Sequence, residues 1–218
     1  MRFIAWRLPG LLGLVFFGAT LLPYTVPLVR AHEQHMAPDH SQTMPGAPAK
    51  YSRQFADYTI PPVALVDMSG ADVTLSDALQ SNPPVLLDFI FTTCTTICPI
   101  TSAIYAEAQE LLANRGLESS LISISIDPEH DSPARLAAYA ERFRARPNWR
   151  LFTGTRSDIA VVQKAFDAYR GDKANHLPVL FMRPSSGAPW VRIEGFAGAA
   201  EIVDEYLRMV SHGAPASD

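Results

Sequence analysis

The feature that most constrains this chain is an apolar run followed by two cysteines, between Val85 and Pro99. Residues 85 to 91 are apolar except for one aspartate, which is typical of a strand buried inside a sheet. Pro99 directly follows the second cysteine, and proline at the first helical position is a helix start signal. The pattern therefore predicts a strand, a turn that carries Cys94, and a helix whose N-cap is Cys98. Unpaired N–H groups and the positive end of the helix dipole would stabilise a thiolate there.

Cys94 and Cys98 are the only cysteines in the 218 residues. Two thiols in one turn favour metal binding or redox chemistry over a structural disulfide framework. The plainer alternative is that both are small buried hydrophobic side chains, as free cysteine commonly is. Three intervening residues permit a disulfide as well as a reduced metal-binding pair, so the oxidation state stays open.

Composition narrows the class of protein. A chain of 218 residues with 48% hydrophobic content can bury one full core, so a single domain is expected between its ends. The net charge of −4 and the lack of a basic cluster argue against nucleic acid as a partner.

Residues 1–31 have the pattern of a signal peptide or a membrane anchor. Arg2 and Arg7 supply positive charge, and residues 8–29 are uncharged and mostly apolar. The residues before His32 suit cleavage, whereas the length of the apolar stretch would also let it span a bilayer. We expect the rest of the chain to be extracytoplasmic, either periplasmic and secreted or anchored to the inner membrane, where cysteines are open to oxidation.

Residues 32–51 are rich in proline and alanine and lack apolar periodicity, so we expect a flexible linker. This segment holds half of the six histidines of the chain, with methionines between and after them. Imidazole and thioether are copper ligands, and a short histidine-rich tract is a metal-binding composition. Weak metal sites are therefore predicted at His32, His35, Met36, His40 and Met44. A solvated segment with incidental histidines is the alternative.

Residues 52–210 alternate between strand and helix patterns, and the end from Ser211 is expected to be disordered. Strands are predicted at 60–66, 73–75, 85–91, 121–126, 149–152, 177–182 and 190–196, and helices at 76–79, 99–114, 133–146, 156–169 and 199–210. The helix at 99–114 is expected to carry its apolar residues on one side, at Ile100, Ile104, Ala108, Leu111 and Leu112. This order predicts an α/β fold with a central mixed sheet flanked by helices and an N-terminal hairpin that turns at Gly70. A strand followed by a cysteine pair at a helix start is typical of a thioredoxin-like fold.

A third metal ligand is sought among the histidines outside the linker. Two thiolates are soft ligands that select Cu(I), zinc or iron–sulfur, and imidazole completes such a site. His130 is flanked by carboxylates and predicted to be exposed, and His212 lies in the terminal segment. His176 directly precedes the strand at 177–182, which in a thioredoxin-like sheet lies beside the cysteine-bearing strand. His176 is therefore the candidate, with a solvated loop histidine as the alternative.

Asp88 is the one carboxylate inside the apolar strand. Burial should raise its pKa, and a neutral or shared proton there could be relayed to the cysteines. The simpler interpretation is a hydrogen bond to a neighbouring backbone group.

Three segments in this order, Asp88–Pro99, Ser125–Pro133 and His176, resemble the Sco (SenC-type) copper-chaperone family. The resemblance implies one copper ion, as Cu(I) or Cu(II), bound by Cys94, Cys98 and His176, with Asp127 and Pro128 shaping the site from nearby. The alternative for Asp127 is a turn residue at the end of a strand. It also implies a role in assembling the Cu(A) centre of cytochrome c oxidase, with subunit II or another extracytoplasmic copper protein as the partner.

Two positions depart from the family pattern. Asn175 stands where many members have aspartate, which would weaken the acceptor that orients the imidazole. Leu177-Pro178-Val179 looks more like the segment that places a proline opposite the cysteines in thioredoxins.

The sequence thus predicts a copper metallochaperone. The rival is an enzyme, a thiol–disulfide reductase that keeps the copper-ligand cysteines of an acceptor reduced, with Cys94 as the attacking thiol. A peroxide-reducing relative would need an arginine near its reactive cysteine, and none lies between Val85 and Asn114.

Overall fold

The computed structural model describes residues 50–80 and 83–213, which all belong to one compact unit, Ala47–Asp218. The predicted export segment and the histidine and methionine sites of the linker lie outside the described residues. Within the described ranges, no helix has the length and apolar character needed to cross a membrane.

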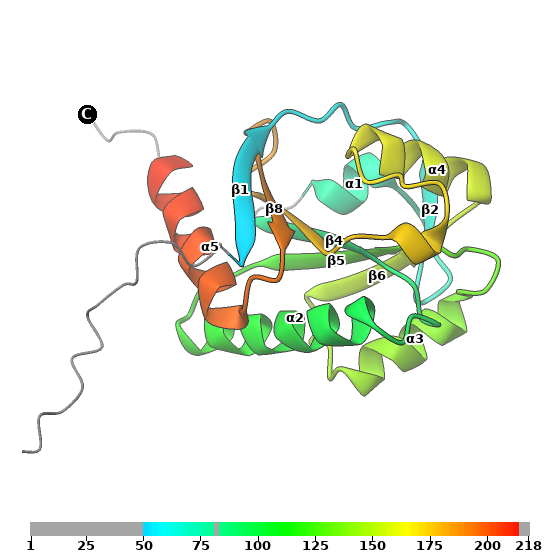
Figure 1. Cartoon of the computed structure of the whole chain (residues 1–218), viewed down its shortest axis with the longest axis horizontal. Coiled ribbons are helices and arrows are strands. Elements are labelled where there is room, and N and C mark those ends of the chain that lie inside the picture. Colours follow the sequence, from blue (N-terminus) through cyan, green and yellow to red (C-terminus); the bar gives the residue numbers. More distant parts are fainter. Residues whose placement is uncertain (1–49, 81–82, 214–218) are drawn as a thin grey trace, which may run out of the picture. The chain divides into compact units, whose positions relative to one another are not determined.

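A single sheet of eight strands forms the centre of the described unit (Figure 1). The strands run in the spatial order β1-β8-β7-β4-β5-β6-β2-β3. Their bounds are β1 (Tyr51–Ala56), β2 (Ala64–Asp67), β3 (Asp72–Thr74), β4 (Val85–Ile90), β5 (Ser120–Ser125), β6 (Trp149–Thr153), β7 (Val179–Arg183) and β8 (Trp190–Gly195). β4, β5 and β6 are parallel, and the other pairings are antiparallel. The predicted mixed α/β sheet, parallel at its centre and with an N-terminal hairpin, is confirmed.

Helices cover both faces of the sheet (Figure 1). They are α1 (Leu75–Leu79), α2 (Ile97–Asn114), α3 (Pro133–Arg142), α4 (Arg156–Ala165) and α5 (Ala199–Gly213), with a short 3₁₀ turn η1 (Lys173–Asn175). The buried strand β4 sends alternate side chains to the two faces. Leu86 and Ile90 join the core under α2, α3 and α5, while Leu87 and Phe89 join the core under α1 and α4. A strand buried on both sides needs a continuous apolar run, which is why it was recognisable.

Helix α2 begins at Ile97, with Thr96 as its N-cap, so the prediction that Cys98 is the N-cap and Pro99 the first helical residue is wrong. The first four N–H groups of a helix have no intrahelical acceptor, so proline is tolerated throughout the first turn. Of the residues expected on the inward side of this helix, Ala108 and Leu112 are buried and Ile104 and Leu111 pack against the core, as predicted, whereas Ile100 is 52% exposed and was wrongly included.

Polar side chains take core positions on α2 that an apolar pattern does not reveal. Ser102 is buried and its hydroxyl lies 2.8 Å from the hydroxyl of Tyr139. Gln109 is also buried and donates to Asn148 at 2.7 Å. Hydrogen bonds to partners on α3 and before β6 make burial of these groups tolerable.

Several ends differ from the predicted ones. α3 and α4 stop at Arg142 and Ala165, short of the predicted ends, and the positive φ values of Arg144 (55°) and Asp167 (50°) follow these stops. Tyr51, assigned to the linker, begins β1, and α5 continues past the predicted end at Val210.

Candidate metal centre

The two cysteines lie together at the turn between β4 and α2. The backbone N–H of Cys98 donates to the sulfur of Cys94 at 3.4 Å, and the hydroxyl of Thr96 lies 3.8 Å from that sulfur. Thr96 makes no capping hydrogen bond with its own side chain. The sulfur of Cys94 therefore accepts from the helix N-terminus in the way a capping oxygen would. Both cysteines are free thiols in the structure.

The two sulfurs have opposite electrostatic surroundings. Burial raises the pKa of the Cys94 thiol, but the hydrogen bonds that it accepts from Cys98 and Thr96 outweigh burial and hold this pKa below its ordinary value. Burial raises the pKa of the Cys98 thiol well above its ordinary value, and the proximity of Cys94 and Asp88 adds to the rise. The helix start thus stabilises a thiolate at Cys94, and the expectation that it does so at Cys98 is wrong because the helix begins earlier.

A buried aspartate that the sequence analysis did not single out holds the cysteine turn. Asp131 is fully buried and accepts hydrogen bonds from the backbone N–H of Thr92 at 3.0 Å and from the Thr92 hydroxyl at 2.5 Å. Its carboxylate also accepts from the hydroxyl of Ser125 at 2.6 Å. Since Thr92 precedes Cys94 by two residues, Asp131 fixes the start of the turn. The signal was its place in the Ser125–Pro133 segment.

Asp127, expected near the site, anchors the other side of it. Its carboxylate lies 2.5 Å from the ammonium of Lys173, in the turn η1 that directly precedes His176. Lys173 and Ala174 line the same surface depression as Cys94. The prediction that β7 lies beside β4 is confirmed, and the loop before β7 does reach the cysteine turn.

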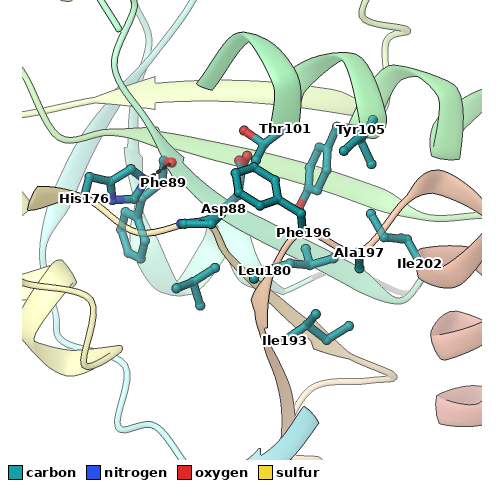
Figure 2. Close-up of a pocket in the computed structure, with 14 residues that line it drawn as sticks. Asp88, Phe89, Thr101, Tyr105, His176, Leu180, Ile193, Phe196, Ala197 and Ile202 are labelled. Atoms are coloured by element: carbon teal, nitrogen blue, oxygen red, sulfur yellow. Dashed lines mark hydrogen bonds between the residues drawn. The ribbon is translucent and has the colours of Figure 1, made fainter. Parts of the chain in front are cut away.

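His176 itself points elsewhere. Its Nε2 lies 2.8 Å from the carbonyl oxygen of Phe89, so Nε2–H is the donor and Nδ1 carries the lone pair. The side chain lines a cavity beneath α2 together with Asp88, Thr101 and Tyr105 (Figure 2). Burial lowers the pKa of the imidazole below its ordinary value, so the ring is in the neutral, ligand-competent form at pH 7.

The structure therefore brings Cys94 and Cys98 together and leaves His176 outside their cluster. Among residues 50–80 and 83–213, no three histidine, cysteine, aspartate or glutamate side chains are grouped closely enough to hold a metal ion. The three-ligand set remains a prediction. Of the other histidines, His130 is exposed as predicted, and the side chain of His212 lies outside the described residues.

The two departures from the family pattern have structural counterparts. Asn175 is exposed at the end of η1, and the orienting acceptor for the imidazole is the carbonyl of Phe89 instead. Pro178 lines the cavity of His176 rather than the depression of Cys94.

Asp88 lies deep in the same cavity. Its carboxylate accepts from the hydroxyl of Ser123 on β5 at 2.6 Å, a side chain rather than a backbone group. Burial raises the pKa of Asp88 to about 7, which confirms the predicted direction. The hydroxyl of Tyr105, in the wall of this cavity, is buried and has no hydrogen-bond partner among the residues that the structure describes.

The sheet order, the thiol pair between β4 and α2, and the histidine loop before β7 define a thioredoxin-like protein with a soft-metal or redox site. The SCO1/SenC family model matches residues 52–185, and the chain belongs to this family.

Curated relatives agree. The SCO1 protein homolog of Bacillus subtilis (strain 168) is 34% identical over 99 residues, which cover 45% of this chain and 50% of that protein. Protein SenC of Rhodobacter capsulatus is 34% identical over 108 residues, 50% of this chain and 47% of that protein. The chain thus spans about half the length of the curated relatives it matches.

Solved structures of Sco proteins share the fold. BsSco, a member of the Sco family of cytochrome c oxidase assembly proteins, aligns with a TM-score of 0.62 and 26% identity over 72% of this chain and 96% of that chain. Yeast Sco1 with copper bound aligns with a TM-score of 0.62 and 24% identity over 74% of this chain and 98% of that chain. The thioredoxin-like fold of the Sco proteins is therefore confirmed for this chain.

Proposed function

We propose that this protein binds one copper ion through Cys94 and Cys98, with His176 as a third ligand. It would pass the copper to the Cu(A) site of cytochrome c oxidase subunit II or of another extracytoplasmic copper protein. The observation that carries the proposal is the contact between the helix N-terminus and the sulfur of Cys94, which keeps one thiolate available beside a second thiol.

The donor set fits copper chemically. Two adjacent sulfurs suit Cu(I), and thiolate is the form that binds a metal. The raised pKa of Cys98 means that its proton must leave when copper binds, so loading should release protons and depend on pH.

His176 supplies what the sulfurs lack for Cu(II). Two thiolates alone reduce this ion: two Cu(II) ions each take one electron while the two thiolates form one disulfide. A neutral imidazole suits both oxidation states of copper. The loop that carries His176 lies at the depression of Cys94 through Lys173 and Ala174, and the ring would reach copper there after a change in the loop that breaks its bond to Phe89.

The relatives support this reading. Sco proteins from yeast and Arabidopsis thaliana have been solved with copper bound, and BsSco belongs to a family of cytochrome c oxidase assembly proteins. The apolar segment at 8–29 supports a location outside the cytoplasm, where such an acceptor would be met.

The test is copper titration of the reduced unit Ala47–Asp218, before and after thiol alkylation. We expect one tightly bound ion, lost on alkylation and lost in Cys94→Ser and in Cys98→Ser. Thr95→Ser, an exposed substitution in the same turn, is the matched control and should bind normally. One-to-one binding retained by either cysteine variant would refute the site.

The alternative function, thiol–disulfide reductase, is favoured by the asymmetry of the two thiols. Cys94 has the lowered pKa and the more open position of an attacking thiol, while Cys98 is buried like a resolving one. Exchange between thiols needs no imidazole ligand. His176→Ala should therefore keep exchange activity and Cu(I) binding but lose stable Cu(II) binding if the copper proposal is right. Identical Cu(II) spectra and lifetimes in wild type and His176→Ala would remove His176 from the site and favour the reductase.

A further inference from the structure

We propose that the ion pair between Lys173 and Asp127 positions the His176 loop at the cysteine turn and thereby sets how well the site holds Cu(II) relative to Cu(I). The proposal rests on the proposed function, because it concerns the same copper site. It assigns a positioning role to Lys173, which neither the sequence pattern nor the family resemblance indicated.

The lysine side chain has two partners at the site. Its ammonium lies 2.5 Å from the carboxylate of Asp127 and 5.6 Å from the centre of the Phe91 ring. The carboxylate is 9% exposed and the lysine side chain 41%, so the pair is half sheltered. Phe91, Cys94 and Lys173 also line one depression. Lys173 therefore closes the side of the cysteine turn that faces η1.

Both ligand-bearing segments are tied to one loop, residues 125–131, which starts at the last residue of β5. On one side, Asp131 accepts from Thr92, two residues before Cys94. On the other side, Asp127 pairs with Lys173, three residues before His176.

Ser125 connects these two anchors. Its hydroxyl donates to Asp131 at 2.6 Å and accepts from the backbone N–H of Asp127 at 3.0 Å. Loop 125–131 thus fixes the position of the histidine loop relative to the cysteine turn, and the Lys173–Asp127 pair is its link to η1.

Loosening that link should affect the two oxidation states of copper differently. The two sulfurs that hold Cu(I) are anchored through Asp131 and the start of α2. Cu(II) needs the imidazole. If the loop that carries the imidazole is not already held in place, Cu(II) binding must also bear the entropic cost of ordering that loop. Loss of the ion pair should therefore weaken Cu(II) binding and leave Cu(I) binding unchanged.

The experiment compares Cu(II) and Cu(I) affinities of wild type and four variants. Lys173→Met removes the charge and keeps the length of the side chain, Asp127→Asn removes the partner charge, and Lys173→Arg keeps the pair. Arg156→Met is the matched control. It breaks the 2.6 Å ion pair between Arg156 and Glu129, which connects the same loop to α4 instead of to η1. For a partly exposed pair, we expect Cu(II) affinity to fall about two- to fivefold in the first two variants only.

A readout without copper completes the test. The backbone N–H groups of Asn175 and His176 donate to the carbonyl oxygens of Asp172, the N-cap of η1, and of Lys173. In the copper-free protein, their hydrogen exchange should be faster in Lys173→Met and Asp127→Asn than in wild type and in Arg156→Met. In the double variant that combines Lys173→Met with Asp127→Asn, exchange should be no faster than in either single variant, because both substitutions break the same ion pair.

Two results would overturn the inference: equal loss of Cu(I) and Cu(II) affinity in Lys173→Met, or exchange at Asn175 and His176 that matches wild type. Failure of the proposed function is a different result, since wild-type protein would then bind no copper while the exchange measurement still reports on the ion pair.

Discussion

Replacing Asp88 with asparagine should stabilise the protein by an amount that grows as the pH rises from about 4 to about 7 and is then constant. Asp88 is buried on β4 and hydrogen-bonded to Ser123, and burial raises its pKa from 3.8 to about 7. Asparagine has the same shape and can accept the same hydrogen bond through its carbonyl oxygen. It differs in that it never becomes charged.

The magnitude follows from linkage between protonation and folding. In the unfolded chain the carboxyl loses its proton near pH 3.8, whereas in the folded protein it keeps the proton up to about pH 7. Between these values the folded state binds more protons, so the free energy of unfolding falls as pH rises, by about 1.4 kcal/mol per unit. Over about three units the wild type loses up to about 4 kcal/mol, which Asp88→Asn avoids.

Urea unfolding of the reduced, copper-free unit Ala47–Asp218 at pH 4.5 and pH 8 measures the difference in free energy of unfolding between wild type and Asp88→Asn. The variant should be close to wild type at the lower pH and more stable at the higher pH. Asp204→Asn, at an exposed position on α5, is the control and should show no such pH-dependent difference. A stability difference for Asp88→Asn that is the same at both pH values would refute the burial argument.

Four further outcomes are expected. In the reduced protein, iodoacetamide should modify Cys94 well before Cys98, with a pH midpoint below that of free cysteine, as followed by peptide mass spectrometry; equal rates would contradict the asymmetry of the two thiols. Asp131→Ala should lower the free energy of unfolding by roughly 3 kcal/mol in urea, because donors from Thr92 and Ser125 lose a buried acceptor; a change under about 0.5 kcal/mol would exclude that role. Deleting residues 32–44 from the chain that begins at His32 should remove weaker copper equivalents and keep the tight one in a titration, and a single equivalent before deletion would rule out the linker sites. Asn175→Asp should tighten copper binding, by up to about tenfold, because the bond to Phe89 is lost when the ring turns to copper and a carboxylate could then accept from the imidazole; an unchanged affinity would exclude that contact.

The parts of the fold that could be predicted are those that local patterns determine. The strand β4 was placed within one residue at its end, because a central parallel strand must be apolar on both faces. The helix starts at Pro133 and Arg156 were also placed correctly, and the structure caps them with the side chains of Ser132 and Thr155.

The parts that could not be predicted depend on partners far along the chain. The inward face of α2 was predicted only in part, because Ser102 and Gln109 are buried by virtue of their hydrogen bonds to Tyr139 and Asn148. The role of Asp131 depends on the loop after β5 folding against the end of β4. A sequence pattern of apolar and polar residues contains neither fact.

His176 shows where sequence reasoning about a site meets its limit. The order of strands predicts that its loop lies at the cysteine turn, and it does. The direction of the ring depends on a different requirement, that a buried N–H finds an acceptor. The pairing between β4 and β7 ends at Asp88 and Leu180. The next residue of β4 is Phe89, and its carbonyl oxygen accepts the hydrogen bond from the ring of His176.

One such hydrogen bond contributes only about 1 kcal/mol net, far less than a bond to a metal ion can supply. The hydrogen bond to Phe89 orients the imidazole, which burial keeps neutral, and a bond to copper would therefore be strong enough to replace that hydrogen bond. Because the sulfurs are already in place and the histidine must be moved, a site of this design would take Cu(I) first and engage His176 only when the ion requires a third ligand.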